Sequence, residues 1–254
     1  MRTWLRRATT GRDEKSDAPK SSDAQPMSAA VAGINTYDFS LSDQQIARGV
    51  HRKRVGAMWD QIGKHQFDYL VEVGLQPQHR MLDVGCGALR GGIHFVRYLE
   101  PGHYYGIDVN ESLLRAGLEH EVPAAGLQGR LPAENLRATS MFESDFGIPF
   151  DYALAVSVFT HLPLNHIRLC LWQLAKAMPP GGRFLATFFR APADLPYDEP
   201  VQQVAVQTHV ERDPFHYRPY ELEWAGSLAG WEFTDIGDWG HPRGQQMAEF
   251  RRPG

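Results

Sequence analysis

Residues 81–87, Met-Leu-Asp-Val-Gly-Cys-Gly, decide the fold of this chain. An apolar run of strand length ends there at two glycines, and Ile93, Val96 and Leu99 then recur at helical spacing. A short apolar run bounded by glycine predicts a buried strand that turns tightly into a helix. Such a strand–turn–helix unit predicts an α/β domain whose sheet is mainly parallel.

The alternation of strands and helices extends to both sides of this unit. Apolar residues at spacings of three and four predict a helix over 59–74, and Asn110 is placed to cap a helix through Leu118. The segment with Pro123 and Pro132 is predicted as a loop. A Gly/Pro turn at 240–244 favours a closing antiparallel hairpin. Further strands are predicted at 103–109, 136–139, 150–159, 183–189, 231–239 and 244–252, and further helices at 164–178 and 219–230.

Composition divides the chain into a tail and one domain. Residues 1–35 carry few large apolar side chains, so we expect a disordered tail before a single domain at 36–254. The formal net charge of −4 argues against a nucleic-acid partner. Two cysteines, Cys86 and Cys170, make no disulfide framework, and no apolar run approaches the roughly 20 residues of a membrane helix. These features favour a cytoplasmic protein without a membrane partner.

Carboxylates follow two of the predicted strands, at the edge where open α/β sheets bind ligands. Asp83 precedes the glycines in a buried strand, where an unpaired carboxylate is costly, so a cationic partner is expected. Gly85 and Gly87 permit close approach of the backbone to a ligand. Asp108 ends the next strand, where an acid accepts hydrogen bonds from ribose hydroxyls. Together they predict a site for a nucleoside that carries positive charge.

Four segments resemble, in order and spacing, the motifs of class I S-adenosylmethionine-dependent methyltransferases. They are MLDVGCGALRGG at 81–92, YYGIDV at 104–109, FDYALAVSVFTHL at 150–162 and LAKAMPPGGRFLATFF at 174–189. The resemblance implies an α/β fold with a Rossmann-like, doubly wound, seven-stranded and mostly parallel sheet that ends in an antiparallel hairpin. It also implies S-adenosyl-L-methionine as the cofactor and a substrate lid at 191–217.

The resemblance further assigns cofactor contacts to individual residues. The methionine part would meet the glycine loop and its acid, the ribose would meet the end of the second strand, the sulfonium would lie near the fourth strand, and the adenine would lie beyond the third. The residues assigned to the methionine part are Asp83, Gly85, Cys86 and Gly87. Asp108 and Val109 are assigned to the ribose, Ser157 to the sulfonium, and Ser140, Met141 or Phe142 to the adenine.

The glycine motif departs from the family pattern at its third glycine. Leu89 stands there, and Arg90 follows it. A guanidinium binds a carboxylate bidentately, so Arg90 can hold the carboxylate of the cofactor. The alternative is an exposed arginine in the first turn of a helix.

Two histidines are candidate catalytic bases for transfer to oxygen. His161 follows the fourth strand, where relatives place residues near the methyl group, and His216 lies in the expected lid. Either could take a proton from the acceptor, although His161 could instead organise its loop. Trp59 and Gln66 could cap the cofactor or serve only in helix packing.

The predicted function is methyl transfer from S-adenosylmethionine to a small molecule or glycan, at oxygen. SVFTHL at 157–162 replaces the Asn-Pro-Pro-Tyr-type motif of amino-group methylation, and no histidine spacing predicts a metal site. Two alternatives stay open. One is a non-catalytic module that binds S-adenosylmethionine, and the other is an NADP-dependent oxidoreductase, because Gly85, Gly87 and Gly91 fit its glycine pattern.

Overall fold

The computed structural model describes Tyr37 and residues 39–254, so the tail predicted at 1–35 lies outside the described residues. The strands are β1 (Met81–Val84), β2 (Tyr104–Asp108), β3 (Leu136–Ala138), β4 (Tyr152–Ala155), β5 (Arg183–Arg190), β6 (Val201–Gln202), β7 (Gln207–Thr208), β8 (His216–Tyr217), β9 (Glu232–Asp238) and β10 (Gln246–Arg251). The α-helices are α1 (Asp43–Ala47), α2 (Val50–Arg54), α3 (Trp59–Glu72), α4 (Gly92–Tyr98), α5 (Glu111–Ala116), α6 (Val122–Ala124), α7 (Leu164–Ala177) and α8 (Pro219–Ser227).

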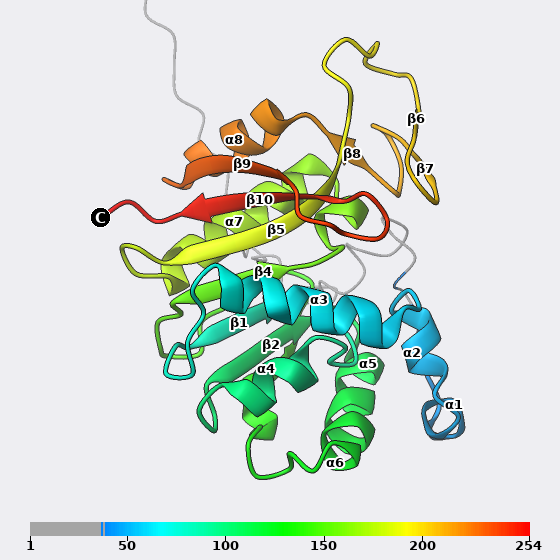
Figure 1. Cartoon of the computed structure of the whole chain (residues 1–254), viewed down its shortest axis with the longest axis vertical. Helices are drawn as coiled ribbons and strands as arrows, with labels where there is room; N and C mark the ends of the chain where they lie inside the picture. Colours follow the sequence, from blue (N-terminus) through cyan, green and yellow to red (C-terminus); the bar gives the residue numbers. More distant parts are fainter. Residues whose placement is uncertain (1–36, 38) are drawn as a thin grey trace, which may run out of the picture.

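The main sheet has the order β3-β2-β1-β4-β5-β10-β9 (Figure 1). Strands β1 to β5 pair in parallel, whereas β10 is antiparallel to both β5 and β9. The prediction of a mostly parallel α/β sheet with a closing antiparallel hairpin is therefore confirmed. The short strand β8 adds an eighth member because it pairs with the end of β5.

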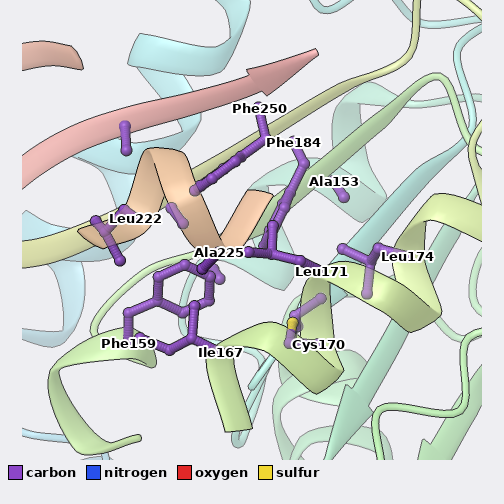
Figure 2. Close-up of a cluster of buried hydrophobic side chains, with 14 of the residues drawn as sticks. Ala153, Phe159, Ile167, Cys170, Leu171, Leu174, Phe184, Leu222, Ala225 and Phe250 are labelled. Atoms are coloured by element: carbon purple, nitrogen blue, oxygen red, sulfur yellow. The ribbon is translucent and has the colours of Figure 1, made fainter. Parts of the chain in front are cut away.

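Hydrophobic clusters cover both faces of the sheet. Leu82 and Val84 of β1 belong to the cluster under α7 and α8, while Met81 belongs to the cluster under α3 and α4. This split follows from the strand geometry, which points successive side chains to opposite faces. Figure 2 shows Phe184 and Phe250, from β5 and β10, reaching toward the helices of the first cluster. Because β1 to β5 run in the same direction, their carboxyl ends lie together at one edge of this buried sheet.

The helix after β2 begins as predicted and ends later. The side chain of Asn110 accepts a hydrogen bond from the backbone N–H of Leu113, which caps α5. The helix then runs through a π-helical turn, Gly117–Glu121, into α6. Pro123, predicted in a loop, lies in α6 directly after the π-helical turn.

Two segments stand outside the alternating core. The short helices α1 and α2 precede α3 at one end of the sheet, and the β6–β7 hairpin projects beyond β5 and β8 (Figure 1). Within the described part of the chain, no helix is both long enough and apolar enough to cross a membrane. Both outlying segments lie toward the carboxyl ends of the parallel strands, where the site described below is found.

Candidate active site

A pocket opens at the carboxyl ends of β1, β2 and β4. The pocket together with its open mouth holds about 1090 Å³ of empty space. Its walls come from the glycine loop, the ends of three strands, the start of α7 and the N-terminal segment. The lining residues are Tyr37, Val55, Gln66, Asp83, Val84, Gly85, Cys86, Gly87, Arg90, Gly91, Ile107, Asp108, Val109, Leu113, Thr139, Ser140, Phe142, Val156, Ser157, Val158, His161, Leu162 and His166.

Asp83 lines the pocket with its carboxylate buried. The hydroxyl of Tyr104 donates a 2.7 Å hydrogen bond to Oδ2 of Asp83, and no described cation lies within ion-pair distance. Burial raises the pKa of Asp83 to about 7, against the hydrogen bond from Tyr104, which lowers the pKa. The cationic partner expected from the sequence is therefore not a side chain that the structure describes.

Asp108 is fixed by backbone donors on both sides. The N–H of Gly87 donates to Oδ2 and the N–H of Asn110 donates to Oδ1, each at 2.8 Å. Burial nevertheless raises the pKa of Asp108 to about 6, because these hydrogen bonds offset only part of the desolvation. The carboxylate is thus oriented and still has lone pairs for hydroxyl donors of a ligand.

The glycine loop keeps a left-handed turn even where its sequence departs from glycine. Gly85 and Gly87 have φ of 70° and 54°, and a Cβ on Gly85 would lie 2.4 Å from Cγ2 of Val158. Leu89, at the position of the usual third glycine, also has a positive φ, 65°. Leucine in this region costs about 1 kcal/mol in backbone energy, which the burial of its side chain offsets.

Arg90 lies within the pocket wall and not on the surface. Its Nη1 donates to the backbone oxygen of Val55 at 2.7 Å and more weakly to that of Ala57 at 3.5 Å. Burial is the main cause that lowers the pKa of Arg90 to about 10, and the charge of the nearby Arg243 contributes to this lowering. The alternative of an exposed first-turn arginine is therefore wrong.

Comparison with known proteins identifies the domain around this pocket. Residues 82–184 match the family described as a methyltransferase domain. This matched part of the chain is a methyltransferase domain. S-adenosylmethionine is the methyl donor of this family, and the matched segment contains the glycine loop, Asp108 and the residues that follow β4.

Solved structures share the fold of this methyltransferase domain at low identity. Magnesium protoporphyrin IX methyltransferase from Synechocystis PCC 6803, with bound S-adenosylhomocysteine, superposes with a TM-score of 0.57 at 14% identity over 83% of this chain and 96% of that chain. The CcbJ methyltransferase from Streptomyces caelestis gives 0.58 at 14% identity over 76% and 90% of the two chains. An S-adenosylmethionine-dependent methyltransferase from Clostridium acetobutylicum ATCC 824 gives 0.58 at 11% identity over 84% and 100%.

The chemistry of the pocket in this methyltransferase domain fits S-adenosylmethionine. Two buried carboxylates without a described cationic partner complement a ligand with ammonium and sulfonium charges, and Arg90 complements a carboxylate. All of the predicted cofactor contacts line the pocket except Met141, whose neighbours Ser140 and Phe142 take that place. Phe142 has a left-handed backbone, φ 55°, so the chain turns here and Met141 is left outside the lining.

The two candidate histidines, His161 and His216, lie in different surroundings. His161 lines the pocket, and its Nδ1 lies 2.6 Å from Oδ1 of Asp213. His216 does not line the pocket: it is buried in β8 with Nδ1 3.0 Å from the hydroxyl of Thr208. Geometry therefore supports His161 as a catalytic candidate and removes the support for His216.

Helix α3 contributes one of its two candidate cofactor contacts. Gln66 is buried in the pocket wall, whereas Trp59 does not line the pocket and packs beside His51 and under the guanidinium of Arg52. Trp59 and Gln66 are seven residues apart, about two helical turns, so they lie on the same side of α3 but at different points along its axis. Only the one that faces Gly91 reaches the site.

Tyr37, Val55 and Thr139 are among the pocket residues that were not anticipated from the sequence. Tyr37 and Val55 come from the segment before α3, and Thr139 follows β3. The ring of Tyr37 meets the ring of His161 edge-on at a centroid distance of 5.3 Å. The sequence feature that could have indicated Tyr37 is the pair of aromatic residues, Tyr37 and Phe39, that follows a stretch with few large apolar side chains.

Proposed function

We propose that this methyltransferase domain transfers the methyl group of S-adenosylmethionine to a hydroxyl oxygen of a small molecule or sugar. The observation that carries the proposal is the His161–Asp213 pair at the wall of the cofactor pocket. The bound cofactor supplies an electrophilic methyl group on a sulfonium. The chain must then position the acceptor in line with that group and remove a proton from it.

We assign the cofactor contacts as follows. Asp108 holds the ribose hydroxyls with the lone pairs that its backbone donors leave, and Asp83 faces the cationic methionine end beside Gly85, Cys86 and Gly87. Arg90 binds the carboxylate of the cofactor. Ser140 and Phe142 bound the adenine, Val109 flanks the ribose, and Ser157 lies near the sulfonium. All of these side chains or backbones line one pocket, which supports their assignment to one ligand.

His161 is the proposed general base. If Nδ1 donates its proton to the carboxylate of Asp213, the other ring nitrogen, Nε2, is unprotonated and can accept the proton of the acceptor hydroxyl. The carboxylate also stabilises the imidazolium that forms, as in other carboxylate–histidine pairs. Asp213 acts through His161, so it is a positioning residue.

Residues 191–217 are the proposed acceptor lid. The segment carries the projecting β6–β7 hairpin, and it brings Asp213 to His161. The backbone N–H of Phe215 also donates to the oxygen of Thr160 at 2.7 Å, which fastens the segment to the loop after β4. Exposed apolar side chains in the hairpin region, Tyr197, Val204 and Val206, suit contact with an organic acceptor.

The proposal is tested by binding and then by turnover. Calorimetry with S-adenosylmethionine, S-adenosylhomocysteine, NADH and NADPH should show binding of the first two only. Incubation with S-adenosylmethionine and a panel of hydroxylated aromatics, sugars and matched amines should then yield S-adenosylhomocysteine with a hydroxyl compound. Binding of a nicotinamide cofactor alone would overturn the assignment. Turnover with amines alone would overturn the attack by oxygen, and binding without turnover on the panel would favour a non-catalytic module.

A further inference from the structure

The segment that covers the pocket joins α3 through an unusual turn. Gly56, Ala57 and Met58 are consecutive left-handed residues with φ of 94°, 53° and 49°. Left-handed backbone is strained for the non-glycine residues Ala57 and Met58, so the turn needs fixed contacts to persist. We call Tyr37 with residues 39–58 the N-terminal cap, because Tyr37 and Val55 within it line the pocket.

Two arginines donate hydrogen bonds to the carbonyl groups of this turn. Arg90 follows the glycine loop and donates to the oxygens of Val55 and Ala57. Arg243, in the loop between β9 and β10, donates through Nη2 to the oxygen of Gly56, the residue between them. Three consecutive carbonyls are thus bound by guanidinium groups from two distant parts of the chain.

The two arginines form a positive pair without a carboxylate partner among the described residues. No ion pair of that part of the chain includes Arg90 or Arg243. The charge of Arg243 contributes to the lowered pKa of Arg90. The pKa of His241 is lowered to about 4, first of all by burial and then by the charges of Arg90, Arg243 and His65. The hydrogen bonds of Arg90 to described residues all use Nη1, so Nη2 and Nε retain donors for an anion at the pocket wall.

The remainder of the cap is fastened to α5 and to the π-helical turn. Asn110 donates to the backbone oxygens of Tyr37 and Phe39, at 3.1 and 2.7 Å. Glu121 receives hydrogen bonds from His51 at 2.6 Å and from both nitrogens of the Arg52 fork at 2.7 Å. The cap is therefore anchored at its far side, and the turn at 56–58 is the part whose attachment depends on Arg90 and Arg243.

We propose that Arg90 and Arg243 couple recognition of the cofactor carboxylate to closure of the N-terminal cap. A carboxylate bound to the free donors of Arg90 offsets the charge of the arginine pair and fixes the guanidinium that holds Val55 and Ala57. Arg243, which does not line the pocket, is a positioning residue that secures the carbonyl between them. The cap is then held closed over ligands that carry the carboxylate, with Tyr37 kept against His161.

The inference rests on S-adenosylmethionine as the cofactor and adds a selection for its amino-acid end. The probe is decarboxylated S-adenosylmethionine, which keeps the nucleoside, the sulfonium and the ammonium group and lacks only the carboxylate. Calorimetry on the whole chain should give at least tenfold weaker binding for this analogue than for S-adenosylmethionine, because a charge-assisted contact to a guanidinium is lost. Hydrogen exchange of amides 39–58 should slow with S-adenosylmethionine and much less with the analogue.

Three substitutions separate the roles of the two arginines. Arg90→Gln should abolish the tenfold preference, and Arg243→Gln should reduce it by at least threefold while also reducing the protection of amides 39–58. Arg48→Gln is the matched control, since Arg48 is an exposed arginine of the cap that lies away from the turn. Thermal unfolding of each variant establishes that it is folded.

The outcomes separate this inference from the assignment of the cofactor. If neither ligand binds the wild-type chain, the assignment of the cofactor fails. If both bind with equal affinity, or if both protect amides 39–58 equally, the cofactor stands and the coupling is overturned. If Arg90→Gln still prefers S-adenosylmethionine to the decarboxylated analogue, the role given to Arg90 is overturned. If Arg243→Gln changes neither this preference nor the protection of amides 39–58, the role given to Arg243 is overturned.

Discussion

The two sides of the pocket are built in different ways. The cofactor side comes from the ends of adjacent strands, where the register of β1 with β2 sets Asp83 opposite Gly106 and brings Asp108 to the N–H of Gly87. The acceptor side joins His161 after β4, Asp213 near β8 and Tyr37 from the N-terminal cap. The first side is a product of the sheet, and the second is assembled from loops distant in sequence.

This difference predicts how each side responds to substitution. The cofactor side depends mainly on backbone geometry, so substitutions there should impair ligand binding and leave the acceptor side in place. Side-chain contacts between separate segments dominate the acceptor side, so their loss should impair turnover while the cofactor still binds. The predictions below test that separation, from the largest expected effect to the smallest.

Asp108→Ala should have the largest effect. It removes the acceptor of the Gly87 and Asn110 N–H groups and the proposed partner of two ribose hydroxyls, so the Kd for S-adenosylhomocysteine should rise by roughly 100-fold or more. Calorimetry gives the Kd, and circular dichroism establishes that the variant is folded. An unchanged Kd would contradict the ribose assignment and with it the special role of the strand ends.

His161→Ala should lower kcat by roughly 100-fold and leave the Kd of the cofactor within about threefold. Asp213→Asn should lower kcat by roughly tenfold, since it perturbs the tautomer and orientation of His161 without removing the base. Both are measured by release of S-adenosylhomocysteine with the acceptor found in the panel. His216→Gln is the control outside the pocket, and a loss there equal to that of His161→Ala would show that the two histidines are wrongly ranked.

The affinity for S-adenosylmethionine should fall as the pH is lowered. With a pKa of about 7 in the free protein, Asp83 is largely ionised at pH 8 and largely protonated at pH 6, and only the ionised form attracts a cation. Binding should weaken by roughly tenfold between these values, with a smaller further loss as Asp108 titrates near 6. Asp83→Asn should bind more weakly and flatten the dependence, and a flat profile in the wild-type chain would count against the cationic subsite.

The same carboxyl groups affect the stability of the free protein with the opposite sign. Their pKa values in the folded state lie above the ordinary value of 3.8, so the folded protein binds protons more tightly than the unfolded chain. This contribution to stability is present at low pH and is lost as the pH rises through about 4 to 7. Thermal unfolding with and without ligand between pH 6 and 8 separates it from the effect on binding.

Glu121→Gln should have the smallest effect, because it acts on the far side of the N-terminal cap. Burial by itself would raise the pKa of Glu121, but hydrogen bonds from Arg52 and His51 hold it below its usual value. Loss of the charge should cost about 1 kcal/mol in the free energy of unfolding, a modest value since Arg52 is half exposed. Urea unfolding gives this energy, and a change in cofactor Kd above about threefold would show that the cap belongs to the cofactor side.

Much of the fold and the cofactor side could be predicted because their signals are local. Strand, turn and helix follow one another within 81–99, and the left-handed turn needs Gly85 and Gly87 within a few residues of Asp83. Asp108 falls at the end of the next strand because neighbouring parallel strands end at one edge. Leu89 shows the limit of such patterns, since a leucine holds the backbone conformation for which the family motif uses glycine.

The acceptor side could be predicted only in part because its partners meet through tertiary packing. His161 was found from its position after a strand, but nothing in the spacing of residues 161 and 213 indicates that they are 2.6 Å apart. His216 is an equally plausible base in sequence, yet pairing of β8 with β5 turns it into the interior. Tyr37 reaches the pocket only because the N-terminal cap folds back over the strand ends.

The position of β10 has a consequence for the synthesis of this protein on the ribosome. Although β10 follows β9 in the sequence, it lies between β5 and β9 in the sheet (Figure 1). Until residue 251 has left the exit tunnel, β9 has no place in the sheet, and β5 presents an apolar edge with unpaired backbone groups. Such an edge is a template for association between nascent chains. A chain stopped at Gly244 would keep that edge permanently, and its aggregation, followed by light scattering, would measure how far the final strand protects the protein.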